Sequence, residues 1–104
     1  MSAWDVVVIF WDDFSFEWDG RKNEENIKKH GVSFEIALHV FNDENRLEEY
    51  DIDHSLDEDR YVTIGFVRDV LTVVYTERGY KIRIISARKA SKKEVERYYE
   101  QFNH

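Results

Sequence analysis

The side chains best suited to chemistry in this sequence are a cluster of cations in its C-terminal third and two histidines. Arginine suits the binding of phosphate because its planar fork stays charged and donates two hydrogen bonds at once. Histidine exchanges protons near neutral pH, which makes His30 and His54 candidates for acid or base catalysis. The clustered cations are Arg78, Lys81, Arg83, Arg88, Lys89, Lys92, Lys93 and Arg97.

Structural explanations compete with catalysis at both histidines. His30 precedes Gly31, where we expect a helix to end, and a histidine there interacts favourably with the helix C-terminus. His54 lies in an acidic segment and can equally bridge to a partner. The acidic residues of this segment are Asp43, Glu44, Glu48, Glu49, Asp51, Asp53, Asp57, Glu58 and Asp59. The chain is therefore bipolar, with a basic C-terminal third that suits an anion and an acidic middle that suits a basic partner.

Length and composition exclude several kinds of protein. With 104 residues the chain is expected to form one domain, 1–104, around a single core. The absence of cysteine excludes disulfides, thiolate nucleophiles and cysteine zinc sites. The acidic stretch 51–59 lacks the glycine and the terminal glutamate of a calcium loop, so we expect neither a metal nor a cofactor. The apolar run Val6 to Phe10 is too short to cross a bilayer, which favours a cytoplasmic protein without membrane contact.

The elements that must position the cations form an antiparallel meander. Three segments rich in Val, Ile, Tyr and Thr are typical of strands, and two-residue turns at Arg68-Asp69 and Arg78-Gly79 are predicted to join them. The predicted strands are Tyr61–Val67, Val70–Glu77 and Tyr80–Ala87.

Alternation along these strands predicts two different faces. The predicted core face carries Val62, Ile64, Phe66, Leu71, Val73, Tyr75, Ile82 and Ile84. The predicted open face carries Tyr61, Thr63, Gly65, Thr72, Thr76, Lys81, Arg83 and Ala87, a surface that suits a phosphate chain. In this register Arg60 falls on the apolar face opposite Glu77, where an ion pair competes with a catalytic role.

Further strands and helices are predicted on both sides of the meander. Asp19 and Gly31 frame a polar helix, 20–30, on which Lys22, Asn26 and Lys29 share a face. Strands are expected at Trp4–Phe10, along Phe14, Phe16 and Trp18 after an Asp12-Asp13 turn, and at Arg46–Tyr50. A second helix begins at Ser33 and buries Phe34, Ala37, Leu38 and Phe41. A third begins at the Ser91/Glu94 capping box and presents Val95, Tyr98, Tyr99 and Phe102.

Several motifs, in order, resemble the BrnT family, the toxin half of a bacterial type II toxin–antitoxin pair. The resemblance covers about Phe16 to Tyr99. It is carried by Phe16-Glu17-Trp18-Asp19, Lys22-Asn23, Asn26, Lys29-His30-Gly31-Val32-Ser33-Phe34, Asp53-His54-Ser55, Arg60, Gly65, Val74-Tyr75-Thr76-Glu77-Arg78-Gly79 and Arg83-Ile84-Ile85-Ser86-Ala87-Arg88.

The resemblance implies an α+β, RelE-like fold, in which two N-terminal helices and a C-terminal helix accompany a twisted, mainly antiparallel sheet. It implies a metal-independent ribonuclease that is neutralised by a BrnA-like, DNA-binding antitoxin, with which it can form a heterotetramer. Members of the family usually begin near the equivalent of Phe16, so residues 1–15 are expected to be an N-terminal extension.

Cleavage of RNA without metal needs a proton acceptor, a proton donor and cations around the phosphate. Arg83 is the first candidate for the cationic role because the predicted register places it on the open face. The predicted catalytic residues are Arg83, Arg60, Arg88, His30 and Glu49, and the predicted RNA-binding residues are Lys22, Lys29, Lys81, Tyr61, Lys92 and Lys93. A different interpretation is a module without catalysis that only binds an antitoxin and modulates its DNA binding.

Overall fold

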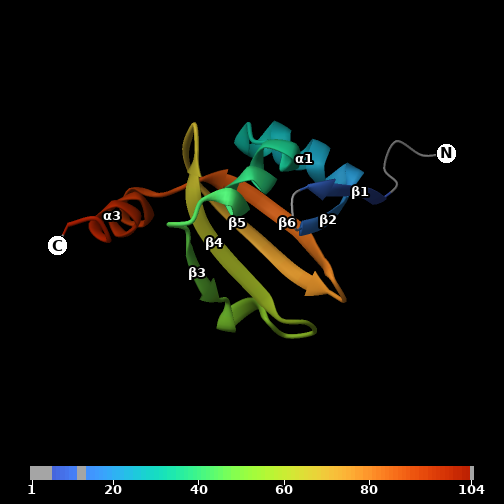
Figure 1. Cartoon of the computed structure of the whole chain (residues 1–104). Coiled ribbons are helices and arrows are strands. Elements are labelled where there is room, and N and C mark those ends of the chain that lie inside the picture. Colours follow the sequence, from blue (N-terminus) through green and yellow to red (C-terminus); the bar gives the residue numbers. More distant parts are fainter. Residues whose placement is uncertain (1–5, 12–13, 104) are drawn as a thin grey trace.

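The computed structural model describes residues 6–11 and 14–103. Trp4, Asp5 and the predicted Asp12-Asp13 turn lie outside the described residues. Six strands form one mixed sheet in the order β1-β2-β6-β5-β4-β3 (Figure 1), in which β2 and β6 are parallel and all other neighbours antiparallel. The strands are β1 (Val6–Trp11), β2 (Phe14–Asp19), β3 (Leu47–Tyr50), β4 (Arg60–Val67), β5 (Asp69–Arg78) and β6 (Lys81–Lys89). This mainly antiparallel sheet confirms the predicted fold class at the α+β level.

Helices begin where the sequence provides caps. The Asp19 carboxylate accepts a hydrogen bond from the Arg21 amide at 2.8 Å, and Gly31 ends the helix with a φ of 71°. The predicted second helix is shorter than expected, because its α-helical part gives way to a 3-10 helix at Leu38. The helical elements are α1 (Gly20–His30), α2 (Phe34–Ala37), η1 (Leu38–Asn42), η2 (Ile52–His54) and α3 (Lys92–Glu100). Within the described residues, no helix has the length and apolar character needed to cross a membrane.

The core face of the sheet, which carries Leu71, Val73, Tyr75 and Ile84, is covered by α2 and η1. Phe41 of η1 packs edge-on against Tyr75 with ring centroids 5.0 Å apart. The buried side chains of this cluster are Phe16, Trp18, Val32, Phe34, Ala37, Leu38, Val40, Phe41, Leu71, Val73, Tyr75, Ile84 and Ala87. The residues predicted to be buried by the second helix are therefore confirmed as core.

The predicted register between β4 and β5 is wrong by one residue. Val67 pairs with Asp69, so the chain turns at Arg68, which adopts a φ of 61°. A shift of one residue sends every side chain of a strand to the opposite face. Val62, Ile64 and Phe66 therefore lie on the open face, defined as the side of the sheet that carries Thr72 and Thr76, whereas Tyr61, Thr63 and Gly65 lie on the core face.

Gly65 belongs on the core face for a steric reason. A Cβ atom at this position would come within 2.8 Å of Val40 Cγ1 and 3.2 Å of Arg46 Cβ. The glycine thus allows η1 and the chain that follows it to pack closely on β4. Its predicted place on the open face was wrong because the resemblance and the strand pattern carry no information about this contact.

The predicted turn between β5 and β6 is also displaced. Arg78 pairs with Lys81, so the two connecting residues are Gly79 and Tyr80, and Gly79 adopts a φ of 62°. This shift of two residues keeps each side chain on its predicted face. A β-bulge then leaves Ile85 without a partner, because Tyr75 pairs with Ile84 and Val74 with Ser86. The extra residue turns the Ala87 side chain into the core. The prediction that Ala87 lies on the open face is therefore wrong.

α3 covers one end of the open face (Figure 1). The buried Tyr98 packs with Ile64 and Val70, and Val95 and Val62 pack at the margin of the same cluster. Ile64 and, at its margin, Val62 thus belong to a second, smaller core under α3, whereas Phe66 is 48% exposed. The rest of the open face stays accessible beside it.

Candidate functional site

Three arginines, Arg60, Arg83 and Arg88, lie on the open face. Arg60 of β4 pairs with Thr76 of β5, and Thr76 pairs with Arg83 of β6. Arg88 stands on the same side because it pairs with Thr72. The prediction that Arg60 faces the core opposite Glu77 is therefore wrong, since the one-residue shift of β4 moves it to the face that carries Arg83.

Arg83 has a buried partner on the neighbouring strand. Its Nη1 donates a hydrogen bond to Oε2 of Glu17 at 2.5 Å, and Glu17 is only 8% exposed. The Lys81 ammonium lies 3.9 Å from the other oxygen of the same carboxylate. The first predicted catalytic residue thus lies on the open face but is held in an ion pair with the neighbouring strand β2.

Arg88 forms a denser polar cluster with the first turn of α3. Its guanidinium donates two hydrogen bonds to the Glu94 carboxylate, at 2.7 and 3.1 Å. The same carboxylate accepts hydrogen bonds from the Thr72 hydroxyl at 3.0 Å and the Ser91 amide at 2.8 Å. Burial raises the pKa of Glu94, but these hydrogen bonds and the charge of Arg88 outweigh it and lower the pKa to about 2. Glu94 therefore stays ionised beside Arg88.

The segment 51–59, which we call the acidic loop, is held against Arg60 by Ser55, and His54 and Arg60 line the same hollow. The Ser55 hydroxyl accepts a hydrogen bond from the Arg60 amide at 2.8 Å and donates one to the Asp51 carbonyl at 2.6 Å, which closes the loop. Nδ1 of His54 lies 3.0 Å from the Asp51 carboxylate. The carboxylate orients the imidazole and leaves its Nε2 atom for other partners.

Arg60, Arg88 and His54 line one hollow of about 390 Å³ on the open face, which we call the arginine groove. Its walls come from β3, β4, β5, β6, the acidic loop and α3. The groove is lined by Glu49, Asp51, His54, Arg60, Val62, Thr72, Val74, Ile85, Ser86, Arg88 and Glu94. Two cations, an oriented imidazole and carboxylates thus converge on one accessible space.

Arg60 is the cation of the groove with the most freedom to bind a ligand. Within residues 6–11 and 14–103, its guanidinium makes no hydrogen bond or ion pair, whereas Arg88 is held by Glu94. Glu49, on the neighbouring strand β3, accepts a hydrogen bond from Arg97 at 2.9 Å in an exposed ion pair. An anion in the groove can bind Arg60 without displacing a hydrogen-bonded partner, although it competes for this charge with the nearby Glu58 carboxylate.

Lys22, Lys29 and His30 line a different hollow of about 250 Å³, which we call the lysine hollow. Glu25 and Asn26 complete its α1 wall, and Ile85 and Ser86 form its β6 wall. His30 therefore does not join Arg60 and Arg88 in the arginine groove, although the groove and the lysine hollow share their β6 residues.

The remaining predicted site residues lie outside both hollows. Tyr61 is on the core face, where its ring stacks on Tyr75 at a centroid distance of 5.5 Å, so its predicted place on the open face is wrong. Lys92 and Lys93 are exposed in the first turn of α3. Lys81 neighbours Glu17, as described above.

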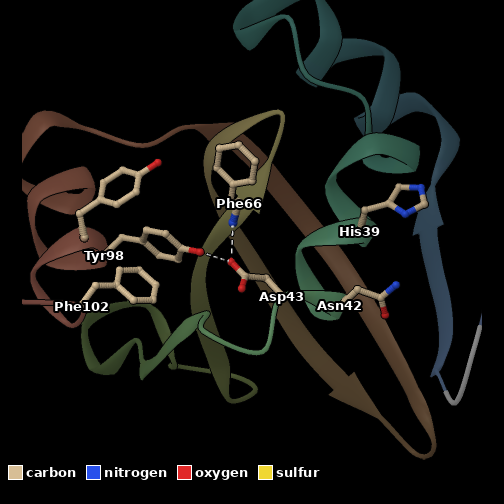
Figure 2. A pocket seen from close by; sticks show the side chains of 7 residues that line it. His39, Asn42, Asp43, Phe66, Tyr98 and Phe102 are labelled. Carbon is tan, nitrogen blue, oxygen red and sulfur yellow. Dashed lines mark hydrogen bonds between the residues drawn. The ribbon is translucent and has the colours of Figure 1, made fainter.

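A third hollow, of about 430 Å³, lies beside the C-terminal end of α3 (Figure 2). We call it the aromatic hollow, and it is lined by His39, Asn42, Asp43, Phe66, Tyr98, Tyr99 and Phe102. In Figure 2 the Asp43 carboxylate faces both the Tyr98 hydroxyl and the Phe66 amide, and it accepts a hydrogen bond from each. Burial raises the pKa of Asp43, but these hydrogen bonds outweigh it and hold the pKa below its usual value.

Among the titratable residues of the groove, Asp51 and Glu94 were missing from the prediction, and His54 was considered for acid or base catalysis but left out of the predicted catalytic set. The i, i+3 spacing of Asp51 and His54 was a usable signal, because one helical turn brings such residues together. Glu94 was assigned to the capping box, a role that it has, and the sequence contains no sign of its second contact with Arg88.

The comparisons with known proteins agree with this architecture. A sequence model described as "Ribonuclease toxin, BrnT, of type II toxin-antitoxin system" matches residues 18–94. The crystal structure of the Brucella abortus ribonuclease toxin BrnT is similar to this chain with a TM-score of 0.55 and 26% sequence identity, over 72% of this chain and 94% of that chain. No curated protein matches the chain. Since the matched residues make up well over half of its length, the chain belongs to the BrnT family of ribonuclease toxins from type II toxin–antitoxin systems.

Proposed function

We propose that this chain is a metal-independent endoribonuclease whose active site is the arginine groove. The observation that carries the proposal is the convergence of Arg60, Arg88, His54 and Glu49 on one accessible hollow. Phosphodiester cleavage needs cations beside the phosphate and groups that move protons on either side of it. The groove provides both kinds of group within one space.

The arginines stabilise the phosphate during the reaction. Arg60 and Arg88 bind the non-bridging oxygens, where negative charge increases as the pentacovalent transition state forms. Arg88 exchanges its hydrogen bonds with Glu94 for hydrogen bonds to the phosphate. Arg83 stays paired with Glu17 of the neighbouring strand β2, without contact to the reacting atoms.

Two side chains move the protons. The Glu49 carboxylate accepts the proton of the 2′-hydroxyl, and the 2′-oxygen attacks phosphorus to form a 2′,3′-cyclic phosphate. Protonated His54 gives a proton to the departing 5′-oxygen, so that the P–O5′ bond breaks without formation of an alkoxide. Asp51 keeps the imidazole oriented for this transfer.

The proposal is tested by incubating the purified protein with RNA in the presence and absence of EDTA. We expect equal cleavage in both, with products that end in a cyclic phosphate. Arg60→Ala should lower kcat/KM about 100-fold or more, the cost typical of removing one donor to a transition-state oxyanion.

Arg78→Ala is the matched control for Arg60. Arg78 also faces the acidic loop, where it binds Glu58 at 3.1 Å, but it does not line the groove. Its variant should cleave RNA like the wild type. Intact RNA after incubation with the wild type, or equal losses in the two variants, would contradict the proposed active site.

The finer properties of the system belong to the same proposal. We expect the toxin to act in the cytoplasm, to have a RelE-like arrangement of its helices, and to be neutralised by a BrnA-like antitoxin in a heterotetramer. The acidic segment 43–59 suits a basic surface on that partner.

A module that binds the antitoxin without cleaving RNA is the second candidate function. The observation that favours it is the pairing of Arg83 and Arg88 with Glu17 and Glu94, which leaves fewer free cations for a phosphate. In that case the protein would bind its partner at wild-type strength and leave RNA intact.

A further inference from the structure

The arginine groove and the lysine hollow meet at a single strand. Both are lined by Ile85 and Ser86 of β6. Ile85 is the extra residue of the β-bulge described above, and a bulge increases the twist of a strand and changes where its side chains point. The two hollows are thus neighbouring parts of one surface that crosses β6.

α1, the helix that carries Lys22 and Lys29, lies beside β6 (Figure 1). The Asn26 side chain donates a hydrogen bond to the Ala87 carbonyl at 2.7 Å and accepts one from the Ala87 amide at 3.1 Å. Asn26 is only 7% exposed, so this contact is shielded from water. Lys22 and Lys29 lie four residues before and three residues after it, on the same side of the helix.

The charge of the lysine hollow suits an anion. Within the described part of the chain, the ammonium groups of Lys22 and Lys29 make no ion pair, and Glu25 contributes a carboxylate to the lining. A basic groove that follows the backbone is the usual way in which proteins hold single-stranded nucleic acid. The hollow therefore offers binding for a second phosphate without breaking an internal contact.

We infer that Lys22 and Lys29 bind a backbone phosphate of the RNA next to the scissile one, so that the substrate strand crosses β6 at Ile85 and Ser86. This inference rests on the proposed function, because it takes the arginine groove as the place of cleavage. It assigns the lysine hollow a role in substrate binding and leaves the chemical step to the groove.

The first test compares Lys29→Ala with Lys28→Ala, two neighbouring exposed lysines of which only Lys29 lines the hollow. On a long single-stranded RNA, Lys29→Ala should raise KM about twofold to fivefold with kcat unchanged. The double variant K22A/K29A should raise KM by a further factor of similar size over that of Lys29→Ala. A dinucleotide substrate lacks the neighbouring phosphate, so its KM should be the same in all variants. Equal KM values for the Lys28 and Lys29 variants on long RNA would overturn the inference.

The second test separates binding from cleavage. Fluorescence anisotropy with a 2′-O-methyl RNA, which cannot be cleaved by 2′-hydroxyl attack, measures affinity at several salt concentrations. K22A/K29A should reduce the slope of log affinity against log salt by about 0.7, since the two lysines bind one phosphate and each neutralised phosphate on a single strand contributes roughly 0.7. Lys29→Arg should keep the wild-type slope because it keeps the charge.

This binding test decides the inference even if the wild type does not cleave RNA. An unchanged slope in K22A/K29A would overturn the lysine site, whereas a reduced slope together with absent cleavage would overturn only the proposed catalysis. Thermal unfolding should be alike in all these variants, because the lysines are exposed.

Discussion

The two ends of α3 border hollows of opposite character. At its N-terminal end, Glu94 lines the arginine groove, where cations and carboxylates pair with each other around an accessible space. At its C-terminal end, Tyr98 lines the aromatic hollow, whose carboxylate Asp43 already accepts hydrogen bonds from Tyr98 and Phe66 (Figure 2).

The difference lies in what a ligand would gain in each place. In the arginine groove an anion can bind Arg60 directly and can compete with Glu94 for Arg88. In the aromatic hollow the described polar contacts of Asp43 are internal, and the accessible atoms belong mainly to half-exposed rings such as Phe66, Tyr99 and Phe102. The two hollows thus differ although both border α3. In the arginine groove charged groups can bind a ligand, whereas in the aromatic hollow the carboxylate is already hydrogen-bonded within the protein.

Each hollow contains a histidine, which gives the sharpest test of this comparison. We expect His54→Asn to lower kcat about 100-fold or more, because it removes the proposed proton donor, and His39→Asn to leave kcat unchanged. Steady-state cleavage of one RNA by both variants is the measurement. Similar losses in the two variants would remove the catalytic distinction between the hollows.

A tyrosine pair tests the structural role of the aromatic hollow. Tyr98→Phe should lower the free energy of unfolding by about 1–2 kcal/mol, because the half-buried Asp43 carboxylate loses a hydrogen bond. Tyr99→Phe is the control, since the Tyr99 ring is 47% exposed and its hydroxyl makes no hydrogen bond within the described residues. Urea denaturation measures both, and RNA cleavage should be unaffected in each. A loss of cleavage in Tyr98→Phe would mean that the two hollows are coupled.

The smallest expected effect concerns Glu94 at the groove. Its pKa is lowered from 4.5 to about 2 in the folded protein, so the carboxylate contributes stability above pH 4.5 that is lost as the pH falls toward 2. Glu94→Gln keeps the helix cap but removes this charge. We expect the wild type to exceed the variant by about 1 kcal/mol at pH 7, because the pair with Arg88 is partly open to water.

That difference should disappear near pH 2, as followed by urea denaturation over a pH series. Glu96→Gln, an exposed change on the same helix, should show no comparable dependence on pH. A Glu94 difference of equal size at pH 7 and pH 2 would indicate that the carboxylate stabilises the protein through packing instead of charge.

The sequence by itself determined the local elements, because their signals lie within a few residues. Asp19, Ser33 and Ser91 begin helices as predicted, and Gly31 ends one, since each cap involves only neighbouring backbone groups. The strands of the meander were likewise predictable from composition. The family could be identified from its motifs, which several parts of the chain carry in order.

Only the tertiary structure decided which residues share the groove. The turn at Arg68 places Arg60 on the open face, and the bulge at Ile85 places Ala87 on the core face. Successive side chains of a strand point to opposite faces, so one residue more or less in a turn or strand reverses the face of every residue that follows. Arg83 and Arg88 look alike in the sequence, and their different partners, Glu17 and Glu94, come from elements that the fold brings beside them. Composition identified the cations, whereas contacts between distant segments determined which of them remain available to bind a phosphate.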